Sequence, residues 1–163
     1  NHIRHEGRKL INEPEISSII RGKSLVGQKG KFNDWGIRVP TVARWPSVVT
    51  AGSSTDILTD CAGLLPTFSE LGGKKDVAHP LDGVSFAKLF TEGKSPSREW
   101  VSPQQKGKIG IRTRNWKLLD NGELFDMRGD PFKEIAILQP DDTEESQAAR
   151  KNLSTFMSRL PRP

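Results

Sequence analysis

Residues 116–126 have the sequence WKLLDNGELFD, which decides the fold of the C-terminal part of the chain. Two short apolar runs, Trp116–Leu119 and Glu123–Asp126, flank the tripeptide Asp120-Asn121-Gly122. Because Asn-Gly tolerates positive φ, this arrangement predicts a hairpin. Two further candidate strands precede it at short intervals, and together the four runs predict a small antiparallel sheet: Glu99–Val101 and Gly110–Thr113.

The last part of the chain predicts a helix over Thr143–Leu160. Its apolar residues follow a spacing of four, three and four, which places them on one helical face: Ala149, Leu153, Phe156 and Leu160. The acidic run 141–145 lies at its start, where the helix dipole favours negative charge, and Pro161 ends it. We expect this helix to cover the predicted sheet.

The part of the chain before the predicted sheet is less regular. Residues 1–31 show no sustained period and are predicted to be irregular, whereas Ile37–Pro46 is rich in β-branched residues and is predicted as a strand bounded by prolines. Apolar residues recur at helical spacing in Cys61–Leu71 before Gly72-Gly73, which predicts a helix with a glycine stop. Val84–Phe90 is expected to form a short helix after a turn at Asp82-Gly83.

This order of elements predicts the fold class α/β. The end of an α/β layer is followed by a small antiparallel sheet with one C-terminal helix. We place the boundary between two domains at residue 95, so that 1–95 belongs to the α/β layer and 96–163 forms the sheet with its closing helix. Trp45, Trp100 and Trp116 occur in strand-like runs and are predicted to anchor the core.

Composition excludes several classes of protein. The chain has 163 residues, 25 Lys and Arg against 20 Asp and Glu, and a net charge of +5 that is spread along its length, which argues against a nucleic-acid-binding arm. No run approaches the roughly 18 apolar residues of a membrane span. The single Cys61 excludes an internal disulfide and a thiolate zinc site, and it is expected to be a semi-buried filler.

A few polar residues are candidates for chemistry. Lys29 lies in the glycine-flanked segment Gly27–Lys31, where its ammonium group would suit sulfate or phosphate, although a lysine between glycines in a surface loop is more often simply solvated. His2 and His5 could form a metal or acid–base pair or lie exposed in a loop. The chain begins at Asn1 without Met or a signal-peptide pattern, so its start does not indicate a cellular location.

Taken together, residues 22–160 resemble the C-terminal half of sulfatases of the arylsulfatase type, within the alkaline-phosphatase-like superfamily. The segment Gln28–Pro40 resembles the family element Gly-Lys-Gly-x-x-x-(Glu/Asp)-x-Gly-x-Arg-Val-Pro. Five further segments resemble family elements in the same order: Arg44-Trp45-Pro46, Leu64–Gly72, Leu81–Phe86, Arg98–Val101 with Arg112–Leu118, and Glu123–Asp126 with Asp130-Pro131.

The resemblance implies a hydrolase that cleaves sulfate esters of a small molecule or carbohydrate. It assigns Lys29 to a sulfate oxygen, Asn1 to a calcium ion and His5 to the substrate. It also implies a periplasmic or secreted location. The family's nucleophile, a formylglycine made from a Cys or Ser in a Cys/Ser-x-Pro-x-Arg motif, is not in this sequence, so the isolated chain is expected to be inactive.

Two other functions stay open at this point. A phosphodiester or phosphonate hydrolase of the same superfamily would use similar anion and metal sites. A degenerate, non-catalytic relative would only bind anionic glycans. The sequence gives neither the particular ester nor the oligomeric state.

Overall fold

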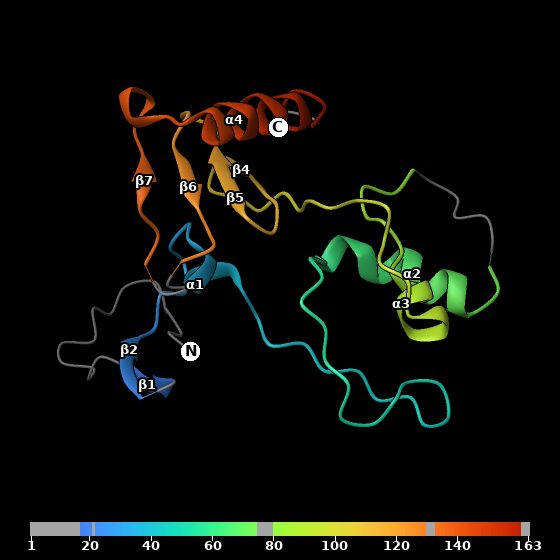
Figure 1. The fold of residues 1–163 in the computed structure, drawn as a ribbon. Helices are drawn as coiled ribbons and strands as arrows, with labels where there is room; N and C mark the ends of the chain where they lie inside the picture. The colour runs from blue at the N-terminus through green and yellow to red at the C-terminus, as the bar shows by residue number, and fades with distance from the viewer. Residues whose placement is uncertain (1–16, 21, 75–79, 130–132, 161–163) are drawn as a thin grey trace, which may run out of the picture. The chain divides into compact units, whose positions relative to one another are not determined.

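A computed structural model describes residues 17–20, 22–74, 80–129 and 133–160 (Figure 1). The chain divides into two compact units, one ending at Arg38 and one beginning at Val39, and each is described by itself. The predicted boundary at residue 95 falls within the second unit. Asn1 and His5 lie outside the described residues.

The first unit contains a two-stranded hairpin and one helical turn. Strands β1 (Ser17–Ile20) and β2 (Lys23–Val26) pair antiparallel, with Ser17 opposite Val26, and α1 spans Asp34–Ile37. The prediction that residues 1–31 are irregular is therefore wrong for the hairpin. Gly22 has a φ of 76° at the turn, which is the conformation that a glycine adopts without strain.

The strand predicted over Ile37–Pro46 is also wrong. Ile37 ends α1, and the residues from Arg38 to Trp45 have no regular structure. The prolines at positions 40 and 46 cannot donate a backbone hydrogen bond to a ladder, and Val42 is 92% exposed. A β-branched composition needs a partner strand and a face to bury, and this segment has neither among the described residues.

The second unit contains a five-stranded antiparallel sheet in the order β3-β4-β5-β6-β7. Its strands are β3 (Gln104–Gln105), β4 (Lys108–Arg112), β5 (Trp116–Leu119), β6 (Leu124–Asp126) and β7 (Ala136–Ile137). The predicted hairpin is confirmed, since Gly122 has a φ of 86° and donates its N–H to the Leu119 carbonyl oxygen at 2.9 Å. The strand predicted at Glu99–Val101 is reduced to a single bridge between Val101 and Arg112.

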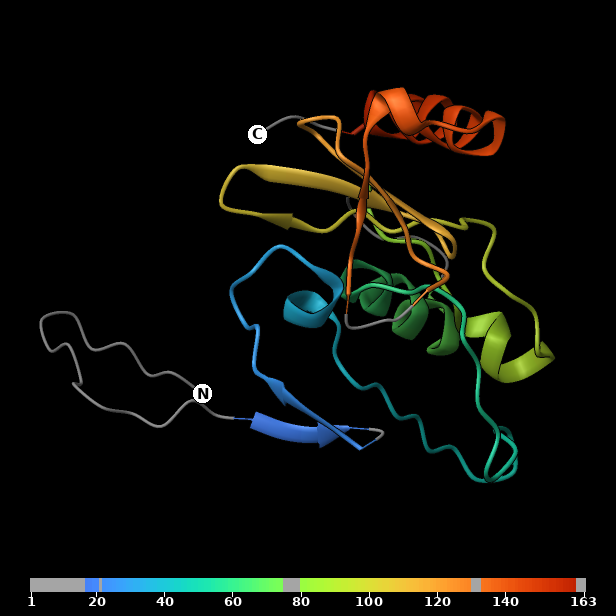
Figure 2. The ribbon, with the colours of Figure 1, turned by 60° about the vertical axis from the view of Figure 1, so that its left-hand side comes forward.

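Helix α4 (Glu144–Met157) covers one face of this sheet, as predicted (Figure 2). It follows the short 3₁₀ helix η2 (Gln139–Asp141), and the Thr143 hydroxyl caps it by accepting the Ser146 N–H at 3.2 Å. Ala149 and Leu153 point into the sheet, where they form the core with three strand residues: Ile111, Leu118 and Leu124. The Trp100 and Trp116 side chains pack against this core, as predicted, and Trp100 stacks on Phe156.

The predicted helix at Cys61–Leu71 is confirmed as the 3₁₀ turn η1 (Cys61–Gly63) followed by α2 (Leu64–Leu71), and α3 (Ala87–Glu92) packs beside it. The buried Thr67 hydroxyl joins these helices, because it donates to the Gly63 carbonyl oxygen at 2.6 Å and accepts the Phe86 N–H at 3.0 Å. The opposite side of α2 is apolar and exposed. Its outward residues are Leu64, Leu65 and Phe68.

Two predicted burial states are wrong. Cys61 is exposed rather than semi-buried, because it lies at the start of η1, outside the contact that buries Gly63. Trp45 is 38% exposed rather than a core anchor, because it belongs to the irregular segment that has no sheet to pack on.

The described residues thus combine helices with antiparallel sheets, and they contain no parallel strand pair. The predicted small sheet with its closing helix is confirmed, whereas the alkaline-phosphatase-like layer stays a prediction. Within the same described ranges, no helix has the length and apolar character needed to cross a lipid bilayer.

The contact between α4 and the sheet predicts the effect of two matched truncations. Leu153 is 2% exposed and Leu138 is 63% exposed. Leu153→Ala should lower the free energy of unfolding by about 2–5 kcal/mol, because it leaves a cavity between α4 and the strands. Leu138→Ala should change it by less than about 0.5 kcal/mol. Urea denaturation followed by tryptophan fluorescence measures both, and equal losses would contradict the assigned core.

The buried hydroxyl of Thr67 predicts a second matched pair. Thr67→Val keeps the shape of the side chain but leaves the Phe86 N–H without its acceptor, which should cost about 1–3 kcal/mol. Thr155→Val removes an exposed hydroxyl that donates to the Lys151 carbonyl oxygen on α4, and it should cost less than about 0.5 kcal/mol. Thermal unfolding of the two variants measures both losses of stability. If Thr67→Val is as stable as the parent, the Thr67 hydroxyl does not stabilise the contact between α2 and α3.

Candidate functional site

Lys29 lies at the corner of a β-turn in the first unit. The Lys31 N–H donates to the Gln28 carbonyl oxygen at 2.9 Å, and Gly30, the third residue of the turn, has a φ of 89°. A type II turn requires positive φ at this position, which is why glycine occupies it. Lys29 takes the second position, and its side chain is exposed.

The loop that carries Lys29 is tied at both ends. It leaves β2 after Val26 and enters α1 at Asp34. The Trp35 indole Nε1–H donates to the Val26 carbonyl oxygen at 3.1 Å and so holds α1 beside the end of β2. Asn33 caps α1, because its side-chain oxygen accepts the Gly36 N–H at 2.7 Å. The Lys29 turn is therefore part of a closed, hydrogen-bonded loop.

This arrangement suits an anion. An exposed lysine on a turn presents a compact positive charge with three donors that can rotate toward a tetrahedral oxyanion. The side chain of Lys31 is also exposed on the same turn. The chemistry that an exposed lysine on such a turn can supply is electrostatic binding and orientation of an anion.

The other predicted site residues cannot be placed. Asn1, predicted to bind calcium, and His5, predicted to face the substrate, stay predictions, since both lie outside the described residues. Within the ranges that the structure does describe, no three His, Cys, Asp or Glu side chains group closely enough to hold a metal ion. The histidine pair His2 and His5 is likewise outside these ranges.

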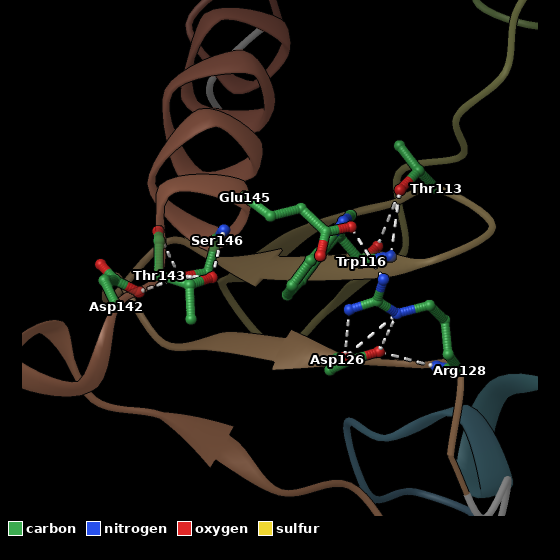
Figure 3. A network of polar contacts seen from close by, with 8 residues as sticks. All are labelled: Thr113, Trp116, Asp126, Arg128, Asp142, Thr143, Glu145 and Ser146. Carbon is green, nitrogen blue, oxygen red and sulfur yellow. Dashed lines mark hydrogen bonds and ion pairs between the residues drawn. The ribbon is translucent and has the colours of Figure 1, made fainter.

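A second polar cluster joins α4 to the sheet (Figure 3). Arg128 donates to both carboxylate oxygens of Asp126 and to Glu145, and its guanidinium lies 4.8 Å from the centre of the Trp116 ring. The hydrogen bond from Arg128 holds the pKa of Asp126 below its usual value. Because these charges pair with one another, we interpret the cluster as a structural link and not as a binding site.

Asp142 is held in a similar way at the start of α4. The Arg150 guanidinium donates to its carboxylate at 3.0 and 3.2 Å, and the Ser146 hydroxyl donates at 2.9 Å. These hydrogen bonds lower the pKa of Asp142 below 3.8, with Arg150 the larger cause. Arg150 also donates to the Gly122 carbonyl oxygen at 2.5 Å, so the same side chain ties α4 to the β5–β6 hairpin.

The lowered pKa of Asp142 predicts a pH-dependent contribution to stability. A carboxyl whose pKa is lower in the folded chain stabilises that chain above pH 3.8, and the stabilisation is lost as the pH falls through the folded-state pKa. Asp142→Asn should therefore lower the melting temperature near neutral pH, and the difference from the parent should shrink below about pH 4. The exposed neighbour Asp141, changed to Asn, provides the control. A pH-independent difference would contradict the assignment.

Sequence reasoning identified the lysine but missed the residues that hold its turn. Asn33 is a residue type favoured at helix N-caps, and this signal was available in Asn33-Asp34-Trp35. The contact between Trp35 and Val26 depends on the β1–β2 hairpin, which the sequence analysis did not predict.

Comparisons with known proteins find similarity to three sulfatases. The chain is 32% identical over 139 residues to an ulvan-active sulfatase of Formosa agariphila, which aligns 82% of this chain with 26% of that protein. It is 28% identical over 113 residues to an N-acetylglucosamine-6-O-sulfatase of Bacteroides thetaiotaomicron, covering 58% of this chain and 20% of that protein. It is 41% identical over 87 residues to human steryl-sulfatase, and this match covers 50% of this chain and 15% of that protein.

No model of a protein family matches the chain. The chain spans about a quarter of the ulvan-active sulfatase and smaller shares of the other two relatives. The names of the three relatives refer to different substrates, but each name describes a sulfatase. Three curated sulfatases thus match the chain, and these matches support its identification as a C-terminal portion of a sulfatase.

Proposed function

We propose that this chain is part of an enzyme that hydrolyses sulfate esters, and that Lys29 contacts a sulfate oxygen in its active site. The observation that carries the proposal is the similarity to three sulfatases, together with an exposed lysine at the corner of a hydrogen-bonded turn. A fixed positive charge beside the sulfate stabilises the negative charge that grows on its oxygens as the ester bond breaks. In this role Lys29 binds and orients the group, and other residues carry out the attack.

The remaining parts of the proposal rest on the resemblance described above. Asn1 offers a side-chain oxygen, the kind of ligand that calcium prefers, and His5 would face the substrate. Bound calcium would withdraw negative charge from the sulfate. The attacking formylglycine would come from a Cys or Ser motif that this sequence does not contain, so the chain alone is proposed to be inactive.

The proposed substrate is a sulfated carbohydrate or small molecule. Two of the relatives bear names that include a carbohydrate, and the third is named for a steryl sulfate. A periplasmic or secreted location and an alkaline-phosphatase-like layer around the site complete the proposal, both on the strength of the family resemblance.

Two lysines of one turn provide the test of the site. Lys29→Ala, made in the complete protein that carries this chain, should lower kcat/KM for an aryl sulfate by about 100-fold or more, as expected when a transition-state charge partner is removed. Lys31→Ala removes an equal, exposed charge from the same turn at a position to which the resemblance assigns no role, and it should change the rate by less than about threefold. Unchanged kinetics for Lys29→Ala would remove this lysine from the site.

Paired substrates separate the proposal from its alternatives. Turnover of an aryl sulfate with little turnover of the matching aryl phosphate or phosphodiester supports a sulfatase, and the reverse preference supports a phosphoester hydrolase. Binding of a sulfated glycan without any release of sulfate by the complete protein would instead support a non-catalytic relative.

A further inference from the structure

Gly36 lies where helix α1 meets the turn that carries Lys29. A Cβ atom at this position would overlap the Lys31 carbonyl oxygen and would lie 2.6 Å from the Gln28 carbonyl oxygen. These two carbonyls belong to the first and last residues of the Lys29 turn. Both contacts are with backbone atoms, so a flexible side chain cannot move aside to make room. The backbone of α1 therefore packs directly against the backbone of the turn.

The direction in which the strain would be relieved follows from the other contacts of α1. The helix is held by two hydrogen bonds outside the turn, because the Trp35 indole N–H donates to the Val26 carbonyl oxygen on β2 and the Asn33 side-chain oxygen accepts the Gly36 N–H. The turn has one internal hydrogen bond, at 2.9 Å, and its corner is exposed. A methyl group at Gly36 would accordingly displace the turn, and Lys29 with it, more than it would displace the helix.

We propose that Gly36 is a positioning residue that sets the place of the Lys29 ammonium group by allowing the turn to lie against α1. This inference rests on the proposed role of Lys29 and adds the residue through which that role is maintained. Gly36 itself would not touch the sulfate. A shift of about 1 Å in a charged group can cost about 100-fold in rate, so a single methyl group should have a large effect here.

A double-mutant cycle in the complete protein tests this inference. Gly36→Ala should lower kcat/KM for an aryl sulfate by about 10–100-fold. In the Lys29→Ala background, Gly36→Ala should lower kcat/KM by less than about threefold. Once the Lys29 ammonium group is absent, a residue that acts only by positioning it has no further effect. Inorganic sulfate gives a second readout. It should raise the melting temperature of the parent and have a smaller effect on Lys29→Ala and on Gly36→Ala.

Gly129→Ala is the matched control, since a Cβ at Gly129 has no atom within 4 Å, and this variant should keep the parent's kinetics. If Lys29→Ala is impaired and Gly36→Ala is not, or if the two losses multiply, the positioning role is overturned while the role of Lys29 stands. If Lys29→Ala itself has the parent's activity, the proposed site fails.

A second pair of variants keeps the test available if Gly36→Ala does not fold. Asn33→Ala removes the oxygen that accepts the Gly36 N–H at 2.7 Å, whereas Asn33→Asp retains an acceptor there. The alanine variant should lose kcat/KM and the aspartate variant should recover most of it. Equal rates for the parent and Asn33→Ala would overturn the inference that α1 positions Lys29.

Discussion

The second unit depends on the apolar contact between helix α4 and the strands β4, β5 and β6. These strands are three to five residues long, and such short strands do not form a stable sheet without a covering layer. Leu153 supplies that layer with Ala149, and Ile111 and Leu124 below them are fully buried. Polar links from the first turn and the middle of the helix then fix its direction: Glu145 pairs with Arg128 next to β6, and Arg150 reaches the hairpin.

Arg98 extends this organisation from the sheet to the helices α2 and α3. Its guanidinium donates to the Asp60 carboxylate and to the Asp82 carbonyl oxygen, both at 2.9 Å, and lies 4.7 Å from the centre of the Trp100 ring. Asp60 in turn caps η1 by accepting the Gly63 N–H. One side chain thus connects the segment before α2, the bend before α3 and an aromatic residue of the core.

Local signals allowed part of this fold to be predicted from the sequence. Asn121-Gly122 defined a hairpin and the spacing of Leu153 and its neighbours defined α4, because turn chemistry and amphipathic periodicity act over a few residues. The β1–β2 hairpin was missed and a strand was wrongly predicted at 37–46, because strand formation depends on a partner that local composition does not reveal. For the candidate site, Lys29 stood out through its glycine-flanked loop, but the close approach at Gly36 is a tertiary contact that no local pattern encodes.

Helix α2 reverses the usual distribution of polarity, since Thr67 faces inward while Leu65 and Phe68, 56% and 65% exposed, face solvent. Exposed neighbouring apolar side chains on one helix favour association between molecules. Leu64, Leu65 and Phe68 therefore form an exposed apolar patch on one short helix, and a change of Phe68 to glutamate would leave the hydrogen bond from the Phe86 N–H to the Thr67 hydroxyl intact.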